Sequence, residues 1–253
     1  MDVSFDYEYV LPDVDEAMAV ANSVNVTKVI QVGCDVASSR WAAKTALEHP
    51  DVWATVALHP NAAAHDTDLD NSLAAIAELA QLPQVRGIGE TGLDYFRTEE
   101  SQAAAQHVSF RAHIDIARQV GKPVIIHDRD AHEDVIETLE THGAPDTVVF
   151  HCFSGDAEMA KVCAQAGWYM SIPGVVTFKN AQQLRDAVLE IPDHLLLVET
   201  DSPFLTPAPN RGLANASTNL PWTVRAICEV RGQSEQEICE LLFSNAARVF
   251  GPF

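Results

Sequence analysis

The chain has 253 residues with an apolar fraction of 47%, 12 glycines and 13 prolines, which excludes a disordered, collagenous or low-complexity protein. Sixteen basic residues against 36 acidic ones give a formal net charge of −20, which argues against general binding of nucleic acid or of an anionic membrane. A metal ion held in one pocket could still reverse the local sign. The length suits one large domain, and we expect residues 1–253 to form it.

Targeting and redox features are few. No apolar run approaches the roughly 18 residues of a membrane span, and the first nine residues lack the basic and then apolar pattern of a leader. Five cysteines without a Cys-x-x-Cys pair predict neither a disulfide framework nor a zinc ribbon. We therefore expect a cytoplasmic protein without a membrane partner. A monomer is favoured, with association left open.

Short runs of consecutive apolar residues recur along the chain, each followed by a polar residue and a helix-like stretch. Such runs are typical of strands buried on both faces of a parallel sheet. In chain order they occupy residues 29–32, 53–58, 85–88, 124–126, 148–150, 168–172 and 195–198. Between and after them, helical periodicity is clear, as in Phe110, Ile114 and Ala117 at i, i+4 and i+7.

The repeat interval of these runs is roughly 30 residues, the size of one unit in a (β/α)₈ barrel. Seven runs are visible, and the only material for an eighth strand is at residues 3–10. We predict an α/β, single-domain (β/α)₈ TIM barrel whose first strand is short or incomplete. A doubly wound open sheet is the alternative, but the glycine-rich first turn usual for it does not follow residues 29–33. Residues 205–221, rich in proline and asparagine, are a candidate lid or substrate loop.

The active site of a barrel is assembled at the carboxyl ends of its strands. The polar residues found there are Asp35, His59, Glu90, His127, His151 and Asp201. Carboxylates and imidazoles are ligands of zinc, manganese and similar divalent ions. A single one of them could simply cap the next helix, but several that converge on one rim favour a metal-assisted hydrolase.

Longer motifs surround these residues. In order, they are residues 87–95 (GIGETGLDY), 122–131 (KPVIIHDRDA), 150–155 (FHCFSG), 199–203 (ETDSP) and 245–251 (NAARVFG). Together they resemble the TatD-like family of metal-dependent hydrolases, a (β/α)₈ branch of the amidohydrolase-type enzymes, over residues 25–251.

The resemblance implies hydrolysis at one or two divalent metal ions (Zn, Mg or Mn), typically of DNA phosphodiester bonds from the 3′ side. Glu90 would bridge two metals, His127 and His151 would hold one of them, and Asp201 would hold the other and steer the attacking water. Two cations bridged in this way activate water and neutralise phosphate charge. We therefore expect a deoxyribonuclease-like enzyme that acts on nucleic-acid ends or on a small phosphoester.

Three further residues are candidates for substrate binding: His59, Arg129 and Arg211. A guanidinium suits a phosphate, although Arg129 could equally form a salt bridge with a neighbouring acid. His59 could contact a phosphate or merely shape the turn before Pro60.

The neighbours of these candidates carry weaker signals. Glu199 lies on the same side of its strand as Asp201 and could support a ligand histidine. Asp94 is as much a structural as a functional candidate. Cys152 is expected to face away from the site, and Ser154 and Asp156 are expected to cap the following helix.

The chain departs from the family pattern at its start. Family members usually open with a His-x-His pair, and this chain has no histidine before His49. Either Phe5 and Tyr7 stand in those places, or the sequence begins after the pair, which we favour. Glu90, His127 and His151 would then hold about one tightly bound metal ion. The alternatives are a metal-dependent amide or ester hydrolase, an aminoacyl-tRNA deacylase, or a barrel with impaired catalysis that serves for binding.

Overall fold

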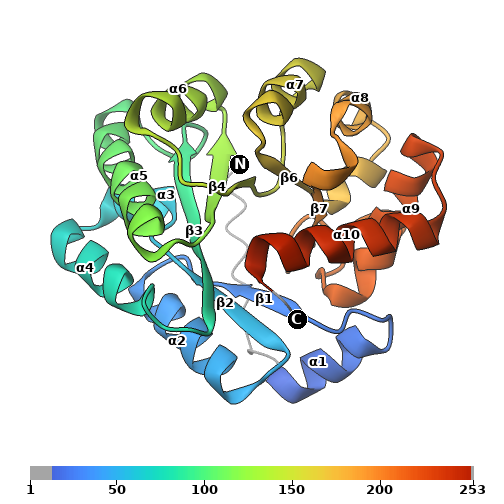
Figure 1. The fold of residues 1–253 in the computed structure, drawn as a ribbon, viewed down its shortest axis with the longest axis horizontal. Coiled ribbons are helices and arrows are strands. Elements are labelled where there is room, and N and C mark those ends of the chain that lie inside the picture. The colour runs from blue at the N-terminus through green and yellow to red at the C-terminus, as the bar shows by residue number, and fades with distance from the viewer. Residues whose placement is uncertain (1–12, 252–253) are drawn as a thin grey trace.

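A computed structural model describes residues 13–251 (Figure 1). Seven strands form one sheet in which all neighbouring pairs are parallel and the strand order follows the chain order. They are β1 (Val29–Val32), β2 (Val52–Val56), β3 (Val85–Asp94), β4 (Val124–Arg129), β5 (Val148–Phe150), β6 (Tyr169–Ile172) and β7 (Leu196–Val198). The predicted α/β class and all seven predicted strands are confirmed. The predicted eighth strand at residues 3–10 lies outside the described residues.

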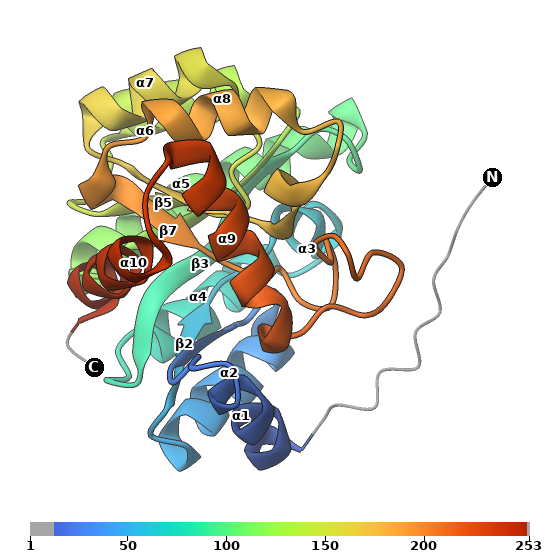
Figure 2. The ribbon, with the colours of Figure 1, turned by 90° about the vertical axis from the view of Figure 1, so that its right-hand side faces the viewer.

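Helices surround the strands, and every crossover between consecutive strands contains at least one helix. They are α1 (Val14–Asn22), α2 (Val36–Glu48), α3 (Pro60–His65), α4 (Leu69–Leu79), α5 (Glu100–Val120), α6 (His132–His142), α7 (Ala157–Ala166), α8 (Gln182–Glu190), α9 (Leu220–Arg231) and α10 (Glu235–Phe250). Short 3₁₀ helices are η1 (Gly174–Thr177), η2 (Asp193–Leu195) and η3 (Ser217–Asn219). The side view shows α7 and α8 packed next to each other (Figure 2). No helix between residues 13 and 251 has the length and apolarity to cross a bilayer.

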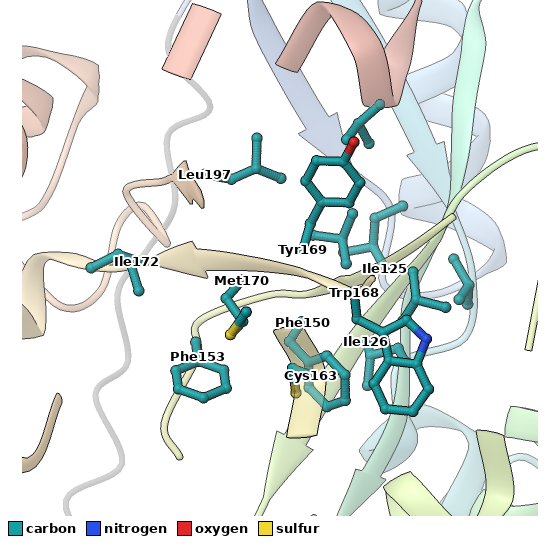
Figure 3. Close-up of a cluster of buried hydrophobic side chains, with 14 of the residues drawn as sticks. Ile125, Ile126, Phe150, Phe153, Cys163, Trp168, Tyr169, Met170, Ile172 and Leu197 are labelled. Atoms are coloured by element: carbon teal, nitrogen blue, oxygen red, sulfur yellow. The ribbon is translucent and has the colours of Figure 1, made fainter. Parts of the chain in front are cut away.

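The core explains the consecutive apolar runs. Ile126 of β4, Phe150 of β5 and Met170 of β6 are buried, and Figure 3 shows them in one cluster. The rings of Phe150 and Trp168 lie 5.7 Å apart between centroids. The apolar parts of these strands are covered on both faces, which explains why their apolar residues are consecutive.

Three elements differ most from the prediction: β3, β4 and the loop at residues 205–221. The strands β3 and β4 continue past the apolar runs, because their backbones pair as far as Asp94 and Arg129 regardless of side-chain polarity. The predicted loop at residues 205–221 is shorter, since η3 and α9 begin within it. Pro221 lies in the first turn of α9, where a missing backbone N–H leaves no helical hydrogen bond unmade.

Candidate metal centre

The parallel strands bring most of the predicted site residues to one rim. Glu90 lies in β3 and His127 in β4, while His151 directly follows β5. Asp201 follows β7, and His59 lies between β2 and α3. Asp35 is the exception among the strand-end residues, because it is exposed and caps α2, its Oδ1 accepting a hydrogen bond of 2.7 Å from the backbone N–H of Ser38.

Glu90 is the centre of the cluster. Its Oε1 lies 3.0 Å from Nε2 of His59 and 3.6 Å from Nδ1 of His127, and its Oε2 lies 2.9 Å from Nε2 of His151. Burial alone would raise the pKa of Glu90. The positive charge of His151 and hydrogen bonds from all three histidines outweigh burial and hold this pKa well below its ordinary value. Glu90 is therefore a partly buried carboxylate surrounded by imidazoles.

Asp94 supports His127 from the other side of the ring. The Oδ2 of this buried side chain lies 3.2 Å from Nε2 of His127. Burial opposes ionisation of Asp94, but hydrogen bonds from His127 and from the backbone N–H of Arg97 lower its pKa overall. A carboxylate behind an imidazole fixes the ring and its tautomer, as in many metal sites. The sequence signal is spacing, since Asp94 lies an even number of residues after Glu90 along β3.

His151 has a similar support. Its Nδ1 lies 2.8 Å from Oε2 of Glu199, the residue that the sequence suggests as a support for a ligand histidine. The same oxygen accepts a hydrogen bond of 3.0 Å from the backbone N–H of Cys152. Burial opposes the charged form of His151, yet Glu199 and Glu90 raise its pKa well above the ordinary value.

The expectation that Cys152 faces away from the site is wrong. Ligand-type atoms of His151, Cys152 and Glu199 lie within 4.8 Å of one another. Cys152 adopts a φ of 46°, in the left-handed region, so the alternation of a strand no longer applies after β5 ends. Ser154 does not cap α7 either: Asp156 does, while the Ser154 hydroxyl donates to the carbonyl of Asp128.

Asp201 lies at the open side of the cluster, with Oδ1 3.8 Å from Nε2 of His151 and 30% of its side chain exposed. Burial raises the pKa of Asp201 to about 7; His151 opposes this rise, and the negative charges of Glu199 and Glu90 add to it. A carboxyl group with this pKa can both accept and return a proton near neutral pH.

His59 has the turn-shaping role considered for it and also reaches the Glu90 carboxylate. Its Nδ1 accepts a hydrogen bond of 3.1 Å from the backbone N–H of Asn61 and caps α3, while its Nε2 reaches Glu90. Within residues 13–251, neither Arg129 nor Arg211 forms an ion pair or hydrogen bond with Glu90. Each lies over an aromatic ring, with Cζ of Arg129 4.1 Å from the centroid of Phe96 and Cζ of Arg211 3.9 Å from that of Phe178.

The donor atoms fit a divalent cation. One ligand-type atom each of His59, Glu90 and His127 lies within 4.8 Å of the other two, and all three side chains are partly buried. The buried Oε1 of Glu199 has no hydrogen-bond partner in the part of the chain that the structure describes. Imidazole nitrogens and carboxylate oxygens are ligands that zinc and manganese bind. A buried carboxylate oxygen without a hydrogen-bond partner or a cation costs free energy. Phe5 and Tyr7, the positions considered for the His-x-His pair, lie outside the described residues.

Comparisons with known proteins agree with this chemistry. The family model of the TatD related DNases matches residues 2–251. The uncharacterized metal-dependent hydrolase TatD of Mycobacterium tuberculosis is 46% identical over 91% of this chain and 88% of the relative. The 3′-5′ ssDNA/RNA exonuclease TatD of Citrobacter rodentium is 33% identical over 94% of this chain and 92% of the relative.

The fold comparison confirms the predicted barrel architecture. The crystal structure of YJJV, a TatD homologue from Escherichia coli, superposes with a TM-score of 0.88 at 26% identity, covering 94% of this chain and 92% of that one. A TatD family hydrolase from Entamoeba histolytica, at 19% identity, has the same fold with a TM-score of 0.80 over 95% of this chain and 90% of its own. The chain belongs to the TatD related DNase family of metal-dependent hydrolases.

Proposed function

We propose that this protein hydrolyses phosphodiester bonds at free 3′ ends of single-stranded nucleic acid. The observation that carries the proposal is the partly buried Glu90 carboxylate within reach of three imidazoles, two of them backed by carboxylates. The exonuclease named among the relatives supports the choice of substrate. A cytoplasmic location is part of the proposal and is supported by five cysteines that are all free thiols.

The proposed ligands are those that the resemblance to the TatD-like family implies. Glu90, His127 and His151 would hold one divalent ion tightly, and Asp201 with Glu90 would hold a second, weaker one. A bound divalent cation supplies Lewis acidity, which lowers the pKa of water and neutralises charge on a phosphate. Asp94 and Glu199 orient the two ligand histidines through their second ring nitrogens.

The remaining steps fall to the protein side chains. Asp201, at the open side of the cluster, would accept the proton of the attacking water. His59, which reaches Oε1 of Glu90 whereas His151 reaches Oε2, would contact the phosphate or the leaving oxygen. Arg129 and Arg211 would contact phosphates of the substrate backbone, because a guanidinium can bind a phosphate through two hydrogen bonds.

The test is to incubate the metal-loaded protein with a labelled single-stranded oligonucleotide, p-nitrophenyl esters and a small peptide panel. We expect 3′-directed cleavage that Glu90→Gln abolishes together with tight metal binding in equilibrium dialysis. Asp35→Asn is the matched control, since it also neutralises a strand-end acid but keeps a side chain that caps α2. Hydrolysis of esters or peptides without nucleic-acid cleavage would overturn the proposal in favour of the other hydrolase classes.

A further inference from the structure

Among its described residues, this acidic protein has cations without ion pairs at or after the carboxyl ends of several strands. Arg97, Arg129, Lys179 and Arg211 follow or end the strands β3, β4, β6 and β7. None of the four forms an ion pair within residues 13–251, whereas six other basic side chains do. A cation without a counter-charge attracts anionic ligands more strongly than a paired one. Six more basic side chains in this range also form no ion pair, so the feature specific to these four is their place at or after strand ends, which suits them to a phosphate backbone at the rim.

Phe96 adds an aromatic surface to this rim. Its side chain is 61% exposed although it is large and apolar, and Cζ of Arg129 lies 4.1 Å from its ring centroid. An arginine on one face of the ring leaves the opposite face for another flat group. Unpaired nucleobases bind proteins by stacking on aromatic rings and guanidinium planes in this way.

The position of Phe96 is tied to the metal centre. The backbone N–H groups of Phe96 and Arg97 donate to Oδ1 of Asp94, at 3.0 and 2.9 Å, while Oδ2 of Asp94 faces His127. The carboxylate that orients a proposed ligand histidine thus also fixes the turn that carries the exposed ring.

The strand register gives the distance from the centre. Gly92 pairs with His127 and Asp94 pairs with Arg129 across β3 and β4. Arg129 is therefore two residues beyond His127 along β4, a step of about 7 Å. A base stacked on Phe96 would lie next to the bond held at the metal centre and not at a remote site.

We propose that Phe96, backed by Arg129, stacks the nucleobase adjacent to the scissile phosphate and selects unpaired 3′ ends. This inference rests on the proposed nuclease function. A base within a duplex has both faces covered by its neighbours, so it cannot stack on Phe96 without leaving the helix. The chemical class recognised is a flat aromatic base next to a phosphodiester, without preference among the bases.

The test uses a single-stranded oligonucleotide and a copy with an abasic site in the terminal nucleotides. We expect Phe96→Ala to raise KM on the normal strand about 10-fold, with kcat nearly unchanged, because stacking of one base contributes at about this level. Phe96→Trp should restore KM. Phe243→Ala is the matched control, since it removes a similarly exposed phenylalanine, 57% accessible, from α10.

The abasic strand isolates the stacking contact. On this strand the wild type should lose about the same factor as Phe96→Ala loses on the normal strand, and Phe96→Ala should lose little more. Equal losses by Phe96→Ala on both strands, or a fall in kcat that Phe96→Trp does not restore, would overturn the inference. Absence of cleavage by the wild type on either strand would instead refute the proposed nuclease function itself.

Discussion

His113 makes the stability of this protein sensitive to mild acid. The side chain lies fully buried on α5, where its Nε2 accepts a hydrogen bond of 3.0 Å from the backbone N–H of Leu58 and its Nδ1 lies 2.7 Å from the carbonyl oxygen of Ser109. His113 must be neutral to form both hydrogen bonds, because only the neutral imidazole has one nitrogen that accepts and one that donates. Burial lowers the pKa of His113 to about 4, against a weaker opposing effect of the Ser109 carbonyl.

The magnitude follows from the pKa values of the two states. The ordinary value is 6.5 and the folded value about 4, so the unfolded chain binds a proton below pH 6.5 that the folded protein does not bind. Stability is therefore intact above pH 6.5, falls as the pH decreases, and stops falling below about pH 4. Between pH 7.5 and pH 5 the loss due to this one residue is about 2 kcal/mol.

The assay is urea unfolding of the wild type and of His113→Gln at both pH values. Glutamine does not titrate, so the wild type should lose about 2 kcal/mol more than the variant between pH 7.5 and pH 5, while the other titrating groups cancel in the comparison. His132→Gln is a control of opposite sign, because the hydrogen bond that His132 donates to the Asp128 carboxylate raises the pKa of His132. Equal losses in the wild type and in His113→Gln would refute the reasoning.

Four further outcomes follow. Asp94→Asn should weaken metal binding by about 10- to 100-fold in calorimetric titration, because His127 loses its orienting carboxylate; unchanged affinity would contradict this support. Gly92→Ala should destabilise far more than Gly167→Ala in urea unfolding, because a Cβ at Gly92 would lie 2.1 Å from the His127 carbonyl oxygen whereas Gly167 has open space. Phe150→Ala should cost about 3–5 kcal/mol of unfolding free energy, and a cost below about 1 kcal/mol would refute tight packing. KM for an oligonucleotide should rise between about 50 and 200 mM salt, and a fall in KM would mean that the net charge dominates.

The strands could be predicted from the sequence because a strand that is buried on both faces has apolar side chains at consecutive positions. The ends of β3 and β4 could not, since ladder hydrogen bonds join backbones whatever the side chains are. The strand-end rule likewise found Glu90 and His127, because topology alone brings the carboxyl ends of parallel strands together.

Other features depend on contacts that no local pattern records. Cys152 turned toward Glu199 through a left-handed backbone, which the strand alternation does not foresee. His113 falls on the buried face of a predicted helix, but its partner Leu58 lies 55 residues earlier in the chain. Helical periodicity can predict that such a side chain is buried, and it cannot predict which donor satisfies it.

The net charge of −20 and a phosphate substrate are compatible because charge acts locally in salt solution. At physiological ionic strength the Debye length is about 8 Å, so acids on the far side of the barrel are screened from a phosphate at the rim. In the proposed function the phosphate would instead meet Arg129 and Arg211, which have no acidic partner among the described residues, and the cation that Glu90 and the histidines would hold. The acidic remainder of the surface then disfavours long duplexes that would extend beyond the rim, and a short unpaired end escapes that repulsion.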